Sequence, residues 1–142
     1  MKKVVGFITG LALAGSATAA FAHHGTSVSY DMEHQWTTDA TVVTFTYANP
    51  HPRMVFVRMN ERGQSEQWES ELISNPSMMM RQGWSRTRSN EALKPGSKVK
   101  LTVSTSKANP RQVVVRNIQN AAGEYIVMNA GPPGAAAQPA AR

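Results

Sequence analysis

Residues 53–72 read RMVFVRMNERGQSEQWESEL, a pattern that is typical of a β-hairpin. The apolar run 53–59 meets the turn sequence Asn60-Glu61-Arg62-Gly63, in which the glycine can adopt a positive φ. After the turn, outward-facing polar residues alternate with three residues that we expect to face inward, Trp68, Ser70 and Leu72. This stretch therefore predicts two antiparallel strands joined by a tight turn.

The segment before the hairpin predicts another strand. Residues 42–47 alternate between two faces, with Val42 on the face opposite to Val43, Phe45 and Tyr47, and their β-branched and aromatic content favours a strand. Asn49-Pro50-His51-Pro52 follows, and neither proline can donate to a β-ladder. We therefore expect the strand to end there, with His51 held in a rigid turn.

One short helix and three further strands are predicted after the hairpin. Asn75 is a good N-cap, Pro76 suits the first helical position, and Gly83 can end the helix in the left-handed conformation. A turn at 94–97 leads to strand candidates at 99–103, 113–118 and 125–128. Because closure removes open sheet edges, we expect a mainly all-β fold, a small antiparallel OB-like β-barrel of five or six strands with one short helix. A two-sheet sandwich is the alternative.

The two ends of the chain do not show this pattern. Lys2 and Lys3, an apolar run over 4–14 and the small-x-small sequence Ala20-Phe21-Ala22 predict an export signal over residues 1–22. The run is shorter than the roughly 20 residues of a membrane span, so we expect a periplasmic or secreted protein without a span in its mature form. Residues 130–142 are rich in Pro, Ala and Gly and predict a flexible tail, which leaves 23–129 for the β-barrel domain.

The composition restricts the chemistry of the protein. The chain has 142 residues and no cysteine, which excludes disulfides, thiolate metal sites and cysteine nucleophiles. Its 15 Lys and Arg exceed its 9 Asp and Glu, but the basic residues are scattered, and we expect no nucleic-acid partner. Metal chemistry would have to use His, Met or carboxylate ligands.

Six short segments stand in a fixed order along the chain: Ala22-His23-His24-Gly25, Asn49-Pro50-His51, Trp68-Glu69-Ser70-Glu71-Leu72, Ser74-Asn75-Pro76, Met80-Arg81-Gln82-Gly83-Trp84 and Leu93-Lys94-Pro95-Gly96. Their joint occurrence resembles a family of small exported bacterial proteins, domain of unknown function family 6152. The resemblance extends from about Ala22 to Tyr125, although family members typically continue the double histidine with Ser and Phe, where this chain has Gly25 and Thr26. It implies export and a small β-barrel-like domain, and no activity.

The histidines that follow the cleavage pattern carry the most informative chemistry. If processing ends at Ala22, His23 becomes the first residue, and its α-amine and Nδ1 can chelate one metal ion in a six-membered ring. A third nitrogen completes a T-shaped set that suits Cu(II), the divalent ion that nitrogen ligands hold most tightly. We expect that ligand to be His51, with His34 less favoured and His24 able to bind through the adjacent amide. Because the ligands must be deprotonated, the site should lose copper below about pH 6.

Other interpretations of these residues stay open. Cleavage after Ala20 would place His23 third, where the amine, two amides and the imidazole bind Cu(II), and cleavage after Ala19 would spoil both arrangements. The double histidine is also compatible with a solvated chain end, and His51 with a turn residue whose ring bonds a backbone carbonyl. The run 78–80 consists of methionines, but consecutive helical residues point about 100° apart, so we expect core packing rather than a Cu(I) site.

No catalytic motif supports an enzyme. The chain has no Gly-rich phosphate loop, no Gly-x-Ser-x-Gly elbow and no His-Glu-x-x-His helix. Glu69 and Glu71 share one strand face at a spacing that could resemble a carboxylate pair, but outward-facing glutamates on a sheet are commoner. Two hypotheses follow: a copper-binding carrier or buffer, and a metal-free module that binds a protein, peptide or glycan partner. An oxidative enzyme built on the same copper site is a third.

Overall fold

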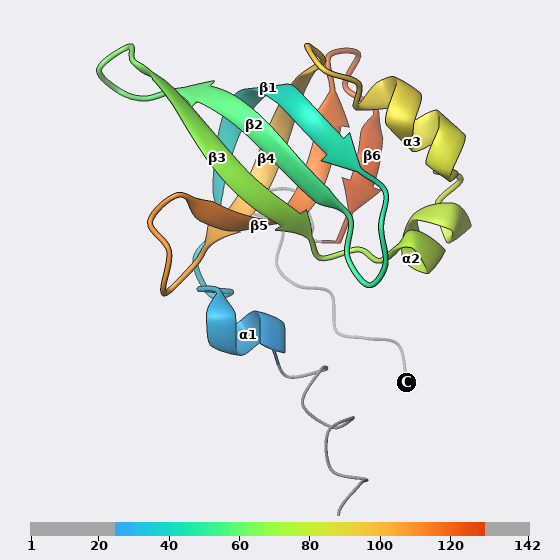
Figure 1. The fold of residues 1–142 in the computed structure, drawn as a ribbon, viewed down its shortest axis with the longest axis horizontal. Helices are drawn as coiled ribbons and strands as arrows, with labels where there is room; N and C mark the ends of the chain where they lie inside the picture. The colour runs from blue at the N-terminus through green and yellow to red at the C-terminus, as the bar shows by residue number, and fades with distance from the viewer. Residues whose placement is uncertain (1–24, 130–142) are drawn as a thin grey trace, which may run out of the picture.

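The computed structural model describes residues 25–129 of the chain (Figure 1). Six strands and three short helices make up this part, in the order α1 (Gly25–Ser29), β1 (Trp36–Thr46), β2 (Arg53–Met59), β3 (Ser65–Leu72), α2 (Pro76–Arg81), α3 (Arg86–Ala92), β4 (Lys98–Thr105), β5 (Gln112–Asn120) and β6 (Tyr125–Met128). The predicted hairpin is confirmed as β2 and β3, and Gly63 in its turn has a φ of 72°. The mainly β architecture is therefore confirmed.

Five of the strands close into a barrel. β3, β2, β1, β4 and β5 are neighbours in that order, and an additional pairing of β3 with β5 closes the ring. The closing pair is parallel, whereas the other pairs are antiparallel, because five strands in a ring cannot alternate direction at every step. This pairing departs from the all-antiparallel prediction, but the strand order and the helices after β3 are those of an OB-like barrel. β6 pairs with β5 outside the ring.

The barrel interior is filled by alternate side chains of its strands. Phe56, Leu72, Leu101 and Val113 are fully buried, as expected for inward-facing strand positions. The assignment of faces in β1 was wrong at one position: Val42 is 1% exposed and packs in the same core as Tyr47. The register of β1 on β2 shifts between Val42 and Thr44, and such an extra residue switches the alternation of faces.

The helices after β3 differ from the prediction in number. α2 is capped as expected, because Asn75 Oδ1 accepts a hydrogen bond from the Met78 amide at 2.9 Å. α3 was not predicted, although Ser85 caps it by accepting from the Arg88 amide. α1 was not predicted either. All three helices are short, and none within residues 25–129 has the length or apolar character needed to cross a bilayer.

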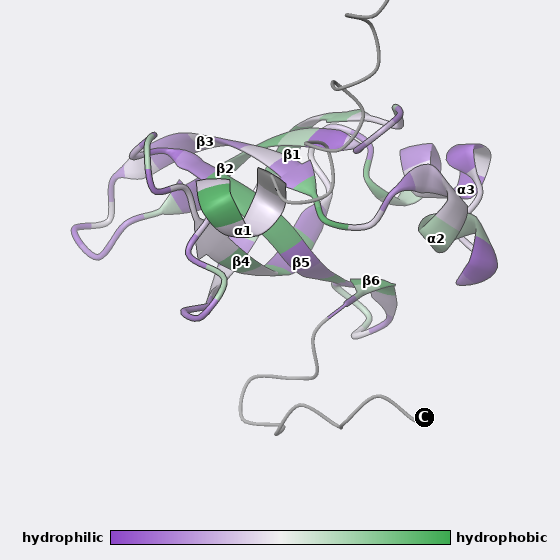
Figure 2. Ribbon diagram, turned by 90° about the horizontal axis from the view of Figure 1, so that it is seen from below, coloured by the Kyte–Doolittle hydropathy of each residue, from purple (hydrophilic) through white to green (hydrophobic). Residues whose placement is uncertain are grey.

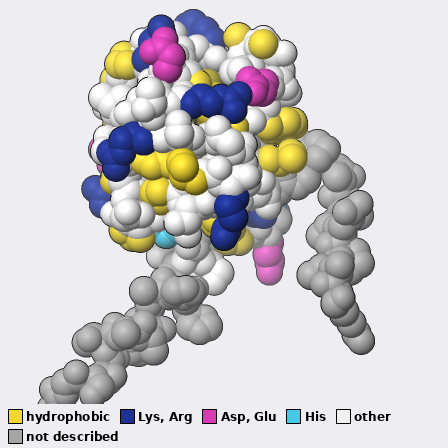
Figure 3. Space-filling model, turned by 90° about the vertical axis from the view of Figure 1, so that its right-hand side faces the viewer, with side chains coloured by type: hydrophobic (Ala, Val, Ile, Leu, Met, Phe, Trp, Pro, Cys, Tyr) yellow, Lys and Arg dark blue, Asp and Glu magenta, His cyan; other side chains and the backbone are white. Residues whose placement is uncertain are grey.

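The packing of these helices leaves part of their apolar surface exposed. Met79 of α2 is fully buried, but Met80 is 56% exposed, so core packing holds for only part of the methionine run. Trp84, between α2 and α3 in the chain, is buried, and the Arg88 guanidinium lies 3.8 Å from the centre of its ring. Figure 3 shows this side of the molecule, where basic side chains surround apolar ones.

Candidate functional site

His51 lies in the loop between β1 and β2, at one end of the barrel. Its Nδ1 stands 3.0 Å from the carbonyl oxygen of Leu72, the last residue of β3, so Nδ1 carries the proton and donates it. This contact agrees with the interpretation of His51 as a turn residue bonded to a carbonyl. It also leaves Nε2 unprotonated and with no partner among the described residues.

The segment that precedes β1 is fixed to the outer wall of the barrel by Tyr30. This side chain is 3% exposed, and its hydroxyl lies against the Glu71 carboxylate of β3 and the Gln112 side chain of β5. Burial raises the pKa of Tyr30 well above its ordinary value, and the neighbouring Glu71 carboxylate raises it further. Tyr30 therefore stays neutral and links the two strands that close the barrel.

Further contacts hold the same segment against the loop between β4 and β5. Lys107 in that loop donates its Nζ to the Ser27 carbonyl at 3.0 Å and its amide to the Ser29 carbonyl at 2.9 Å. The amide of Asp31 donates to Thr105, and Arg116 donates to the Met32 carbonyl. Figure 2 shows α1 in front of the barrel wall when the molecule is seen from below. The chain that follows His24 is thus anchored from Ser27 onward.

The two attachments meet on consecutive residues of β3. Tyr30 contacts Glu71, and the His51 ring is bonded to Leu72. A pocket of about 390 Å³ opens beside His51, and it is also lined by Glu71 and by Arg53, its cross-strand neighbour on β2. The pocket therefore combines an imidazole, a carboxylate and a guanidinium, and the carboxylate is that of Glu71, which Tyr30 also contacts.

Of the other histidines predicted as metal ligands, only His34 lies within residues 25–129, and it is not among the residues that line this pocket. His34 is exposed, and its Nδ1 lies 2.9 Å from Asp31 Oδ2, which lowers the pKa of the Asp31 carboxyl. His23 and His24 lie outside the described residues, so their pairing with His51 stays a prediction. Among residues 25–129, no group of three His, Asp or Glu side chains is close enough to hold a metal.

Sequence reasoning missed the residues that attach the N-terminal segment. Glu71 was interpreted as a solvent-facing strand residue, whereas it faces the Tyr30 hydroxyl. The available signal was Tyr30 itself, because it is the only aromatic residue between the double histidine and Trp36. A single aromatic residue in a polar segment indicates a buried anchor.

Comparison with known proteins places the chain in a family without an assigned role. The model of a family of unknown function, DUF6152, matches residues 12–116, which include both histidine segments and the strands from β1 to most of β5. Searches of curated proteins and of solved structures each found no match. The match covers well over half of the chain and confirms the resemblance seen in its six short segments. The protein therefore belongs to the DUF6152 family.

Proposed function

We propose that the protein is an exported copper-binding carrier or buffer in which His23 of the processed chain and His51 hold one Cu(II) ion. One observation carries the proposal: the N-terminal segment and the His51 ring are attached to neighbouring residues of β3, Glu71 and Leu72. Lys2, Lys3 and the pattern ending at Ala22 support removal of residues 1–22 during export. The protein would act by binding copper rather than by catalysis.

Chain lengths limit how far the terminal amine can lie from the anchored segment. α1 has five residues and is about 7 Å long, at a rise of about 1.5 Å per residue. His23 precedes Gly25 by two residues, which span at most about 7 Å when extended. Because Lys107 holds Ser27 and Ser29, the terminal amine stays within a limited distance of the barrel.

The bonding of the His51 ring supports metal binding at Nε2. Metal-ligating histidines usually donate their other ring nitrogen to a carbonyl or carboxylate, which fixes the tautomer and the direction of the lone pair. The Leu72 carbonyl provides this contact. Since both the amine–imidazole chelate and His51 are nitrogen donors, copper is the metal that they would hold most tightly.

The alternative, a metal-free module that uses the usual ligand face of an OB-like barrel, has less support. Such barrels bind ligands with the face of β2 and β3 and with the β1–β2 and β4–β5 loops. Here the β4–β5 loop is already occupied, because Lys107 holds Ser27 and Ser29, and Tyr30 forms a bridge with Ser106. The N-terminal segment therefore covers part of the surface that another ligand would use.

Copper titration of the exported protein tests this proposal. Intact mass should first show that the mature chain begins at His23. Electron spin resonance should then show nitrogen coupling and a one-to-one endpoint, and His51→Ala should weaken Cu(II) binding at least tenfold. His34→Ala is the matched control and should leave the affinity unchanged, since His34 bonds Asp31. A different N-terminus, or equal affinity in His51→Ala and the unmodified protein, would contradict the proposal.

A further inference from the structure

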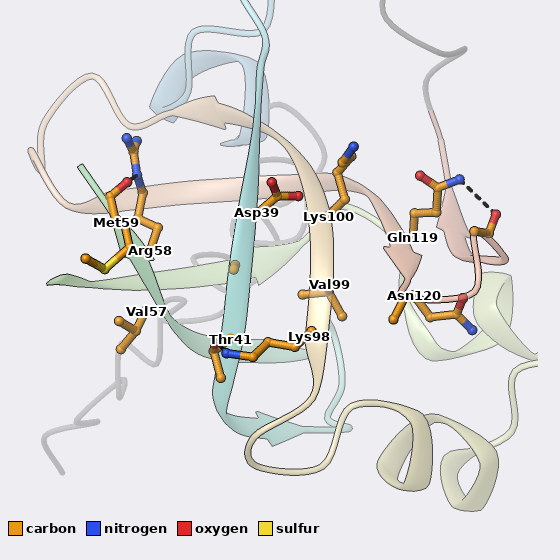
Figure 4. A pocket seen from close by; sticks show the side chains of 13 residues that line it. Asp39, Thr41, Val57, Arg58, Met59, Lys98, Val99, Lys100, Gln119 and Asn120 are labelled. Atoms are coloured by element: carbon orange, nitrogen blue, oxygen red, sulfur yellow. Dashed lines mark hydrogen bonds between the residues drawn. The ribbon is translucent and has the colours of Figure 1, made fainter. Parts of the chain in front are cut away.

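A second pocket, of about 590 Å³, lies on the outer face of the barrel across β2, β1, β4 and the end of β5. Figure 4 shows the residues that line it, with Val57 and Met59 on one side, Asp39 and Thr41 in the middle and Lys98 and Lys100 opposite. Pockets of this size commonly hold a ligand or a short segment of a partner. We call this pocket the outer groove.

The outer groove carries an excess of positive charge. Lys98 and Lys100 are exposed on β4, and Arg58 lies at the margin on β2. Within the described chain, none of these three cations forms an ion pair: the Lys98 ammonium donates to Thr41 Oγ1 at 2.7 Å, and the Arg58 guanidinium lies over the Trp36 ring. Asp39 is the only carboxylate in the lining, so the groove favours an anionic ligand.

The same groove has an apolar side without aromatic residues. Met59 is 59% exposed, and the partly exposed Val57 stands two residues before it on the same face of β2. Nucleic-acid bases are held by stacking on aromatic side chains, and no aromatic residue lines the groove. Methionine instead packs adaptably against apolar side chains of a partner. The lining therefore fits a ligand that carries carboxylates beside an apolar side chain.

The strand pairing shows where the outer groove forms. At Thr41, β1 pairs with both Val57 of β2 and Lys98 of β4, whereas Asp39 and Ala40 pair with β4 alone. The groove therefore lies where β1 separates from β2, and the exposed side chains of Lys98, Lys100 and Met59 line it. From these features we propose that the outer groove binds a short acidic peptide segment of a partner protein. This site is separate from the His51 pocket and does not depend on copper.

A labelled model peptide tests the outer groove directly. The probe is a fluorescein-labelled octapeptide of alternating Glu and Leu, titrated with the full mature protein and followed by anisotropy. We expect saturable binding that weakens as salt rises, since exposed charges are screened. The double variant Lys98→Glu/Lys100→Glu should weaken binding at least tenfold, and Met59→Ser should weaken it about threefold. Lys98→Gln/Lys100→Gln removes the two charges without reversing them and should give an intermediate loss of affinity. This variant keeps the test valid if charge reversal disturbs folding.

The control separates a local site from an effect of net charge. Arg62→Glu/Arg81→Glu makes the same charge change at two exposed residues that do not line the groove, and it should alter affinity less than twofold. Equal losses in both double variants, or no binding of the peptide, would overturn the proposal. Tighter binding of a sulfated oligosaccharide through Lys98 and Lys100 would show that the occupant is an anionic glycan instead. Removal of copper should change none of these results.

Discussion

Tyr30 determines how the N-terminal segment is attached to the barrel, because its buried hydroxyl contacts both Glu71 and Gln112. Tyr30→Phe keeps the ring and removes these contacts. At pH 8 we expect the free energy of unfolding to fall by about 1 kcal/mol, the usual value for a lost hydrogen bond. Urea unfolding followed by tryptophan fluorescence measures this change.

The same variant has a distinct pH dependence. Burial, with a further contribution from Glu71, raises the pKa of Tyr30 in the folded protein. Above about pH 10 the unfolded chain loses this tyrosine proton while the folded chain retains it, so stability falls as pH rises. Tyr30→Phe lacks this loss, and the stability difference from the unmodified protein should shrink between pH 9 and 11. A difference that stays constant with pH would show that Tyr30 ionises normally.

Arg58 stabilises a pair of indole rings at the barrel end opposite to His51. Its guanidinium lies 5.0 Å from the Trp36 ring centre and 5.8 Å from that of Trp68, and the two rings meet edge to face at 5.6 Å. Arg58→Ala should cost about 1–2 kcal/mol, the range for partly desolvated cation–π contacts. Arg58→Lys should cost less. Urea unfolding gives the values, and unchanged near-ultraviolet circular dichroism in Arg58→Ala would contradict this role.

At the level of single elements, the stability of α2 depends on its first residues. The helix has only six residues, and Asn75 satisfies the Met78 amide at its start. Asn75→Ala should lower the free energy of unfolding by about 1 kcal/mol, because an N-cap is lost. Asn75→Asp keeps an accepting oxygen and adds a favourable charge at the helix N-terminus, so it should be nearly neutral. Thermal unfolding of the two variants compares these effects.

The strands could be predicted from the sequence because their signals are local. Alternation of side chains and the turns at Gly63, Gly96 and Gly123, which all have positive φ, give the order and nearly the bounds of β2 to β6. Val42 was placed wrongly because a bulge leaves no mark in the alternation itself. α3 was missed because RTRSNEA has no apolar stripe, so its helical state depends on packing and capping.

The site was less predictable because it depends on contacts between distant segments. The proline-flanked turn indicated where His51 would lie, but not that its ring would be bonded to Leu72, 21 residues later. The contact of Tyr30 with Glu71 likewise follows from barrel closure and from no pattern in either segment. A single sequence predicts residue types and turns well, whereas the approach of two loops requires the fold.

On the scale of the whole molecule, the parallel pairing of β3 with β5 is where the barrel closes. Only four residue pairs form it, from Glu69 with Gln112 to Leu72 with Val115. Tyr30 bridges these two strands from outside, and His51 contacts the end of β3. The proposed copper site would therefore join the N-terminal segment, the β1–β2 loop and the closing strands, so that copper binding stabilises closure of the barrel.

This coupling makes copper a test of global stability. A ligand that binds only the folded protein adds about 2.7 kcal/mol at a free concentration one hundred times its Kd. We expect Cu(II) at pH 7.5 to raise the midpoint of urea unfolding, and EDTA to reverse the rise. His51→Ala should lose most of the gain, and Tyr30→Phe should lose part of it because its N-terminal segment is less firmly held. Hydrogen exchange of β3 and β5 amides should slow on copper addition, whereas slowing confined to the N-terminal segment would show that His51 and the closing strands take no part in binding.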